Sequence, residues 1–226
     1  MTFAEFSDRV RLSVEDICRD IFYENRHQIK VKKEAVVVKN LVNIYNATLK
    51  LSNQKGFHAM SLRDLARETD LSLGALYSYF SGKEQLLGII QEHGARVSGE
   101  MLYTEIKAGR GPEEQLGIAI RTHLYLSEIM QPWFYFFYME TKNLDKKERK
   151  KAIASELNTE QLFTDIISQG MEQGCFTAVD PVLTAASIKA LLQDWYLKRW
   201  KYRGRKVTVD DYAAFVAGLI EKYLKT

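Results

Sequence analysis

The segment 56–87 contains three potential helix starts in close succession, and it constrains the fold more than any other part of the chain. Ser61 can accept a hydrogen bond from the first turn of a helix, and Asp64 stands where an acidic side chain completes a capping box. Ser72 is placed to cap a second helix, and a further S-x-x-E capping box begins at Ser81. Short helices joined by tight polar turns predict a helix-turn-helix.

Apolar residues recur at helical spacing after each of these starts. They are Leu62, Leu65 and Ala66 in the first helix, Ala75, Leu76 and Phe80 in the second, and Leu86, Leu87, Ile89 and Ile90 in the third. The third helix is predicted to open with the box formed by Ser81 and Glu84. Each helix is therefore amphipathic, with one face available for a shared core.

Residues 33–95 closely resemble the DNA-binding domain of the TetR/AcrR family of bacterial transcriptional repressors. The pair Gly56-Phe57 matches the end of the family's first helix, and the second helix opens with S-L-R-D-L-A at 61–66. The recognition helix matches S-L-G-A-L-Y-S-Y-F at 72–80, and K-E-Q-L-L at 83–87 matches the start of the fourth helix. The resemblance implies a homodimer that binds a palindromic double-stranded DNA operator.

In the family the recognition helix enters the major groove, which implies two sets of DNA-binding candidates. Those near base edges or the backbone are Ser72, Leu73, Gly74 and Ser78, and those that reach phosphates from the flanks are Ser61, Tyr77, Tyr79 and Lys83. Arg63 has the reach to bind either a guanine or a phosphate. Leu73 replaces the lysine usual in the family, so that phosphate contact is missing or an apolar contact, such as one to a thymine methyl, takes its place. The alternatives are core tyrosine rings and, for Lys83, a solvated lysine.

Composition fits a soluble globular protein. The chain has 226 residues, 46% of them hydrophobic and 27% charged, with a formal charge of +3. Between Lys30 and Arg96 ten basic residues face six acidic ones, so the positive excess lies on the predicted DNA-binding domain. Two cysteines, the absence of a signal-peptide pattern and no apolar run near the ~20 residues that span a bilayer predict a cytoplasmic protein outside the membrane.

No motif points to catalysis. The four histidines lack paired metal spacing, and the chain has no G-x-S-x-G, phosphate-binding loop or dinucleotide fingerprint. We therefore expect no enzyme activity, no metal and no cofactor. The alternative is an α-helical enzyme or lipid carrier with a diffuse site.

Helical periodicity along the whole chain predicts an all-α fold. We expect an N-terminal helical extension (1–32), a helix-turn-helix DNA-binding domain of three helices (33–95) and a C-terminal helical domain for ligand binding and dimerisation (96–226). The first helix of the DNA-binding domain is expected over 33–53, with Gly56 as its stop. Helices of the C-terminal domain are expected near 112–130, 132–142, 146–170, 181–202 and 208–225.

The extension carries apolar residues three or four apart, which predicts one or two amphipathic helices with Ser13 as an internal cap. One interpretation is a helix packed on the body or on the dimer partner. The other is an arm whose tip, with Lys30, Lys32 and Lys33, contacts phosphates or the minor groove.

The last two helices carry wide apolar stripes that one small domain would struggle to bury alone. The resemblance implies that they pair across a two-fold axis, and the alternative is an internal core. The dimer-interface candidates are Leu183, Ile188, Leu192, Trp195, Tyr212, Phe215, Leu219 and Tyr223.

An aromatic run at 131–140 covers a full helix circumference, so part of it is expected to line a ligand cavity rather than the core. The ligand-binding candidates are Tyr103, His123, Tyr125, Trp133, Phe134, Phe137, Glu140, Phe163 and Gln169. They indicate a small apolar or amphipathic ligand, and two later stretches faintly resemble family members that sense fatty acyl-CoA or other lipids. The expected function is a repressor that its inducer releases from DNA, with a ligand-responsive activator as the alternative.

Overall fold

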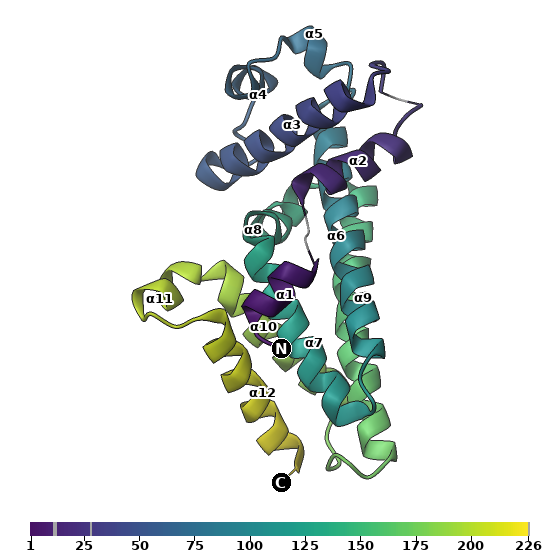
Figure 1. Ribbon diagram of the computed structural model, residues 1–226, viewed down its shortest axis with the longest axis vertical. Coiled ribbons are helices and arrows are strands. Elements are labelled where there is room, and N and C mark those ends of the chain that lie inside the picture. Colours follow the sequence, from purple (N-terminus) through teal and green to yellow (C-terminus); the bar gives the residue numbers. More distant parts are fainter. Residues whose placement is uncertain (11–12, 28, 226) are drawn as a thin grey trace. The chain divides into compact units, whose positions relative to one another are not determined.

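The computed structural model describes residues 1–10, 13–27 and 29–225, and the regular elements throughout these ranges are helices (Figure 1). This confirms the predicted all-α fold. Close contacts divide the chain into two compact units. Unit 1 contains residues 1–10, 96–131 and 154–226, and unit 2 contains residues 11–95 and 132–153. Among the described residues no helix is both long and apolar enough to cross a membrane.

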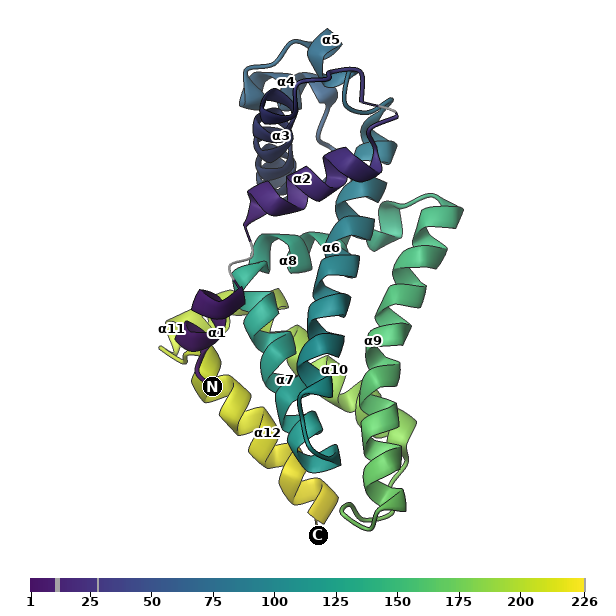
Figure 2. The same cartoon turned by 45° about the vertical axis from the view of Figure 1, so that its right-hand side comes forward.

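Unit 2 holds the helix-turn-helix. Its elements are α2 (Val14–Glu24), α3 (Glu34–Lys55), α4 (Leu62–Thr69), α5 (Leu73–Leu76), the first part of α6 (Lys83–Lys107), most of α8 (Gln131–Glu140), the 3-10 turn η1 (Thr141–Asn143) and the start of α9 (Lys146–Glu172). Helix α2 of the N-terminal extension packs against α3 (Figure 2). The extension therefore supplies part of the packing of this unit.

The predicted helix ends of the helix-turn-helix are confirmed for α3, α4 and α5. Gly56 ends α3 with a φ of 83°, a left-handed conformation that glycine adopts at little cost. The Ser61 hydroxyl accepts a hydrogen bond from the Asp64 N–H at 3.1 Å, and the Asp64 carboxylate accepts one from the Ser61 N–H at 2.9 Å. The Ser72 hydroxyl accepts the Ala75 N–H at 3.1 Å. These local bonds fix where the two short helices begin.

The predicted capping box between Ser81 and Glu84 is wrong by one residue. Helix α6 begins at Lys83, and the Ser81 hydroxyl donates to the Gln85 side-chain oxygen at 2.8 Å. The Ser81 N–H also donates to that oxygen. Because Gly82 precedes the first helical residue, Gln85 occupies the third position of the helix, from which a side chain reaches back most easily.

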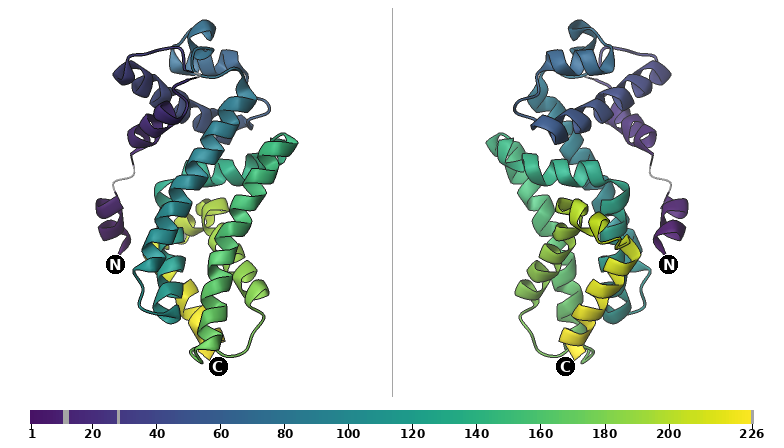
Figure 3. Two further views of the ribbon diagram at one scale, coloured as in Figure 1. Left: turned by 90° about the vertical axis from the view of Figure 1, so that its right-hand side faces the viewer. Right: turned by 90° about the vertical axis from the view of Figure 1, so that its left-hand side faces the viewer.

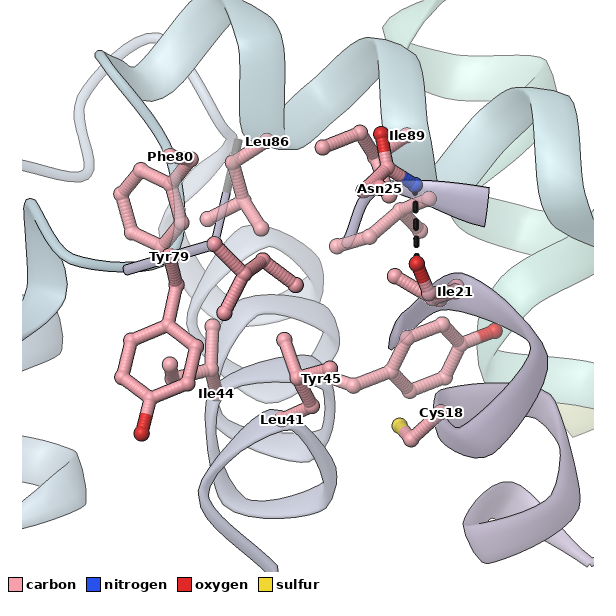
Figure 4. Close-up of a pocket in the computed structure, with 12 residues that line it drawn as sticks. Cys18, Ile21, Asn25, Leu41, Ile44, Tyr45, Tyr79, Phe80, Leu86 and Ile89 are labelled. Atoms are coloured by element: carbon pink, nitrogen blue, oxygen red, sulfur yellow. Dashed lines mark hydrogen bonds between the residues drawn. The ribbon is translucent and has the colours of Figure 1, made fainter. Parts of the chain in front are cut away.

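The core of unit 2 brings together residues far apart in the sequence. Cys18 and Ile21 of α2 face Leu41 and Tyr45 of α3 around a small apolar cavity of about 20 Å³ (Figure 4). Phe80 and Leu86 line its other side. The cavity has room for about one water molecule. The extension thus completes a wall of the DNA-binding domain's core.

Unit 1 is a helical bundle. It contains α1 (Phe3–Val10), the rest of α6, α7 (Pro112–Ile129), the rest of α9, α10 (Pro181–Leu197), α11 (Arg199–Gly204) and α12 (Val209–Lys225). Helix α12 runs alongside α7, which also contacts α10 (Figure 3). Helix α1 docks on α7 through the buried Phe6, whose ring centroid lies 5.5 Å from that of Tyr125. The extension, predicted to form one or two helices, forms two, and Ser13 caps the second as predicted.

The single helix expected over 181–202 is wrong, because the chain breaks it at Lys198 (φ −119°, ψ 37°) into α10 and α11. The Arg199 guanidinium bonds the Glu128 carboxylate at 2.8 and 2.9 Å and lies 4.4 Å from the centroid of Trp195. The Tyr202 hydroxyl donates to the carboxylate of Asp194 on α10. These contacts fold α11 back on α10, which a continuous helix would not allow.

Candidate nucleic-acid interface

The recognition segment, residues 72–80, has one buried side and one exposed side. Leu76, Tyr79 and Phe80 are buried, which fixes the segment to the rest of unit 2. On the other side Leu73 is 37% exposed and Tyr77 48% exposed. Ser72 and Gly74 are also exposed, while Ser78 is half-buried and its hydroxyl donates to the Gly74 carbonyl at 3.2 Å. Large apolar and aromatic groups are thus displayed to solvent beside small residues.

Gly74 leaves open space on this exposed side. A Cβ atom at Gly74 would meet only the Ser72 hydroxyl, at 3.9 Å. Gly94 of α6 differs, since a Cβ there would overlap the indole of Trp133, whereas Gly99 of the same helix is as open as Gly74. Nothing within the protein therefore requires a glycine at position 74, whereas a close approach by another molecule would.

Two of the predicted DNA contacts lie on α4 and its cap. Ser61 and Arg63 are both exposed. Nearby lysines of α3 are neutralised within the unit, since the Lys50 ammonium lies 2.6 Å from the Glu68 carboxylate and that of Lys55 lies 2.8 Å from Asp64. The hydrogen bonds from Lys55 and then from Ser61 hold the pKa of the Asp64 carboxyl well below its usual value. Asp64 therefore stays charged and keeps the capping box formed.

Tyr79 and Lys83 make contacts inside the unit. Tyr79 is buried, and its hydroxyl accepts a hydrogen bond from the Asn40 side chain at 2.7 Å on the side away from the cavity (Figure 4). The Lys83 ammonium donates to the carbonyls of Phe57, His58 and Met60 at 3.2, 3.0 and 3.1 Å. The three protons of this ammonium group thus all have acceptors on the turn between α3 and α4.

The structure divides the ligand-binding candidates between the two units. Trp133, Phe134, Phe137 and Glu140 belong to unit 2, and Tyr103, His123, Tyr125, Phe163 and Gln169 belong to unit 1. The sequence predicts instead that they form one cluster around a cavity. Because sequence separation carries no information on which bundle an aromatic side chain joins, only the packing could separate them.

The unit 2 candidates on α8 pack on the helix-turn-helix. The buried Trp133 indole donates to the Ile90 carbonyl at 3.0 Å. The buried Glu140 carboxylate accepts a hydrogen bond from the Phe57 N–H at 3.0 Å, at the start of the turn before α4. Phe136, which was not among the candidates, lies with its ring centroid 6.0 Å from that of Phe57. Helix α8 is thereby attached to the DNA-binding elements.

The unit 1 candidates differ in burial. His123, Tyr125 and Phe163 are buried, whereas Tyr103 and Gln169 are exposed. The Tyr125 hydroxyl donates to the Asp210 carboxylate of α12 and to the carbonyl of Met1, which precedes α1, so both acceptors lie within unit 1.

Lys189 is a buried polar residue that the sequence analysis missed. Its ammonium lies 3.2 Å from His123 Nε2 and 3.3 Å from the Glu156 carboxylate. Burial lowers the pKa of Lys189, and the nearby Glu156 carboxylate opposes this shift. The pKa of His123 lies well below its usual value, mainly because the side chain is buried and also because of the charge on Lys189. The sequence feature that indicates a buried lysine is its position within the apolar run I-K-A-L-L at 188–192.

The dimer-interface candidates also fall into two groups. Ile188, Leu192, Trp195 and Tyr212 are buried within unit 1, where the rings of Trp195 and Tyr212 stack with centroids 5.1 Å apart. Leu183, Phe215, Leu219 and Tyr223 are exposed, with Leu183 at 65% and Phe215 at 63%. Half of the apolar stripe on α10 and α12 thus forms the core and half faces outward.

Known protein families match both parts of the chain. Residues 44–88 match the model of bacterial regulatory proteins of the tetR family, and residues 109–222 match the tetracyclin repressor-like C-terminal domain. A helix-turn-helix followed by this helical domain defines a class of DNA-binding transcriptional regulators. The chain belongs to the TetR family.

Individual relatives agree with this assignment. The HTH-type transcriptional regulator HbdR of Aromatoleum sp. (strain CIB) is 22% identical over 181 residues, which cover 80% of this chain and 79% of HbdR. The fold is similar to that of AibR in complex with isovaleryl coenzyme A and operator DNA (TM-score 0.70, 23% identity, 78% of this chain and 95% of AibR). It is also similar to that of Bacillus subtilis FadR in complex with stearoyl-CoA (TM-score 0.65, 18% identity, 80% of this chain and 98% of FadR).

Proposed function

We propose that the protein is a homodimeric transcriptional repressor that binds a palindromic operator and is released from it by a mostly apolar small molecule. The observation that carries DNA binding is the exposed side of the recognition segment, where Leu73 and Tyr77 flank the open space at Gly74. The proposed contacts are these residues with Ser72 and Ser78, flanked by Ser61 and Arg63. Tyr79 and Lys83 support the segment from within. Since its target is genomic DNA, the proposed location is the cytoplasm.

The outward-facing half of the stripe on α10 and α12 supports the dimer. Leu183, Phe215, Leu219 and Tyr223 are large apolar side chains exposed in one chain, and burying such groups against a second copy is favourable by about 25 cal/mol per Å² of apolar surface. One helix-turn-helix contacts only a few base pairs. Two helix-turn-helix motifs related by a two-fold axis contact twice as many base pairs, and their symmetry is the reason that a palindromic operator is expected.

An acyl-CoA is the proposed class of inducer. AibR and FadR, whose folds are similar, have structures with isovaleryl coenzyme A and stearoyl-CoA. In unit 1 the bundle that buries Tyr125 and Phe163 also buries the Lys189 and His123 side chains, which offers polar partners within apolar surroundings. Such a combination suits a ligand with a long apolar part and a polar group. Binding would favour a state of the dimer that no longer fits its operator.

The test is selection of bound fragments from the sheared source genome, followed by titration of the recovered duplex at several salt concentrations. We expect a palindrome whose affinity falls steeply as salt rises, and release on addition of isovaleryl-CoA or stearoyl-CoA. Failure to enrich any fragment at low salt would reject DNA binding. Enrichment without release by either thioester would reject only the proposed inducer class.

Activation is the second candidate, because the sign of regulation depends on where the operator lies relative to the promoter. A transcription assay on the recovered promoter separates the two, since a repressor lowers transcription and its deletion raises it. An α-helical lipid carrier or enzyme would bind or convert the ligand without salt-sensitive DNA binding.

A further inference from the structure

The chain between α2 and α3 is attached to the recognition segment. The Lys30 N–H donates a hydrogen bond to the Ser78 carbonyl at 3.0 Å, which joins residues 48 positions apart. Ile29, the preceding residue, is buried, and its N–H donates to the Asn25 carbonyl at 3.0 Å. The segment therefore has a defined place beside the last residues of the recognition segment.

The segment between α2 and α3 is also packed into the core of unit 2. Ile29 lines the same small cavity as three residues labelled in Figure 4, namely Ile21 of α2 and Tyr79 and Phe80 of the recognition segment. The Asn25 side chain donates to the Ile21 carbonyl at 2.9 Å and closes the end of α2. Because the backbone is held at Ile29 and Lys30, little backbone entropy is lost there when the side chains bind a partner.

The exposed side of residues 29–33 is basic. Lys30, Lys32 and Lys33 are exposed, and among the described residues they form no ion pair with a carboxylate. Lys50 and Lys55 of α3, in contrast, are each paired with an acidic residue. Three uncompensated positive charges beside the recognition segment leave a local field that attracts phosphate.

We propose that residues 29–33 form a basic arm that binds the phosphate backbone of DNA beside the groove entered by the recognition segment. The inference rests on the proposed function, because it assigns a second element to the same DNA site. The hydrogen bond between Lys30 and Ser78 sets the register, so the three ammonium groups meet phosphates when the recognition segment meets the bases. Such contacts raise affinity and orient the protein without reading sequence.

The experiment compares the parent with the triple variant Lys30→Gln, Lys32→Gln, Lys33→Gln on the duplex recovered by fragment selection. We expect affinity to fall at least about tenfold at low salt and the slope of log affinity against log salt to flatten by at least about 1. Base preference should stay unchanged. The triple Lys→Arg variant keeps the three charges. Its affinity should therefore stay within about twofold of the parent, and its salt slope should match that of the parent.

A matched control removes three exposed lysines from α9 of the same unit, as Lys146→Gln, Lys147→Gln, Lys150→Gln. If the control lowers affinity as much as the arm variant, a general charge effect accounts for the loss and the arm is rejected. Equal affinity and slope in parent and arm variant would also reject it. If the parent shows no salt-sensitive DNA binding, the proposed function itself fails.

Discussion

Gly74 is the residue of the recognition segment at which the proposed DNA contact can be tested separately from protein packing. Since a Cβ there meets only the Ser72 hydroxyl, we expect Gly74→Ala to leave the free energy of unfolding unchanged or to raise it by up to about 1 kcal/mol. DNA affinity should fall at least about tenfold if the added methyl keeps the backbone from a phosphate or base, a loss of about 1.4 kcal/mol. Thermal denaturation and DNA titration measure the two effects.

Gly99→Ala serves as the control for this substitution, because a Cβ at Gly99 of α6 also meets nothing within 4 Å. It should leave DNA affinity unchanged. If Gly74→Ala binds DNA as tightly as the parent, the exposed side of the segment does not approach DNA closely.

Lys83 distinguishes a structural role from a phosphate contact. Lys83→Met removes hydrogen bonds to three carbonyls of the turn before α4, so we expect the free energy of unfolding to fall by about 1–3 kcal/mol. At a temperature where the variant is folded, DNA affinity should stay within about threefold of the parent. Urea denaturation and DNA titration test this, with Lys146→Met as an exposed-lysine control. Unchanged stability with weaker binding on all sequences would instead identify a phosphate contact.

At the scale of elements, α8 is a structural partner of the helix-turn-helix. Trp133 is buried against Gly94 of α6 and donates to the Ile90 carbonyl, and Glu140 accepts the Phe57 N–H. A displacement of α8 would therefore act directly on the turn that precedes α4. This gives a physical route by which an event at α8 reaches the DNA-binding helices.

We expect Trp133→Ala to lower the free energy of unfolding by about 3–5 kcal/mol, because it removes a large buried side chain and a hydrogen bond. Chemical denaturation measures the loss. Tyr138→Ala on the same helix removes an aromatic ring that is 48% exposed and should cost less than about 0.5 kcal/mol. If both variants keep the parent's stability and Trp133→Ala alone loses response to the inducer, Trp133 contacts ligand and does not support the fold.

At the scale of the whole molecule, the exposed stripe on α10 and α12 is the proposed dimer contact. The double variant Leu183→Lys, Phe215→Lys should sediment as a 26.1 kDa monomer where the parent sediments at twice that mass. Charges facing each other across a symmetric contact repel and lose hydration. Affinity for the palindrome should fall at least about a hundredfold, because a single half-site remains.

Leu157→Lys controls for the loss of an exposed leucine, since Leu157 of α9 is also outward-facing. It should sediment as the parent does. A parent that is monomeric at micromolar concentration would contradict the proposed dimer, whatever the variant shows.

Much of the fold could be predicted because its signals are local. The caps at Ser61 and Ser72 and the left-handed stop at Gly56 depend on atoms within a few residues, so their sequence pattern is enough. The predicted partner of Ser81 in the capping box was wrong, because the same residues allow the helix to begin at either of two adjacent positions. The break at Lys198 could not be predicted, because its cause lies in contacts with Glu128, which is far away in the sequence.

The amino-acid sequence by itself determined the all-α fold, the helix-turn-helix and the match to the TetR family, since periodicity, caps and motif spacing act over short distances. Only the tertiary structure decided which half of the apolar stripe is core, that Lys83 bonds three carbonyls, that α8 packs on the turn before α4, and that Lys30 is tied to Ser78. Burial and long-range hydrogen bonds depend on which elements meet, and identical apolar patterns serve a core and an exposed surface equally well.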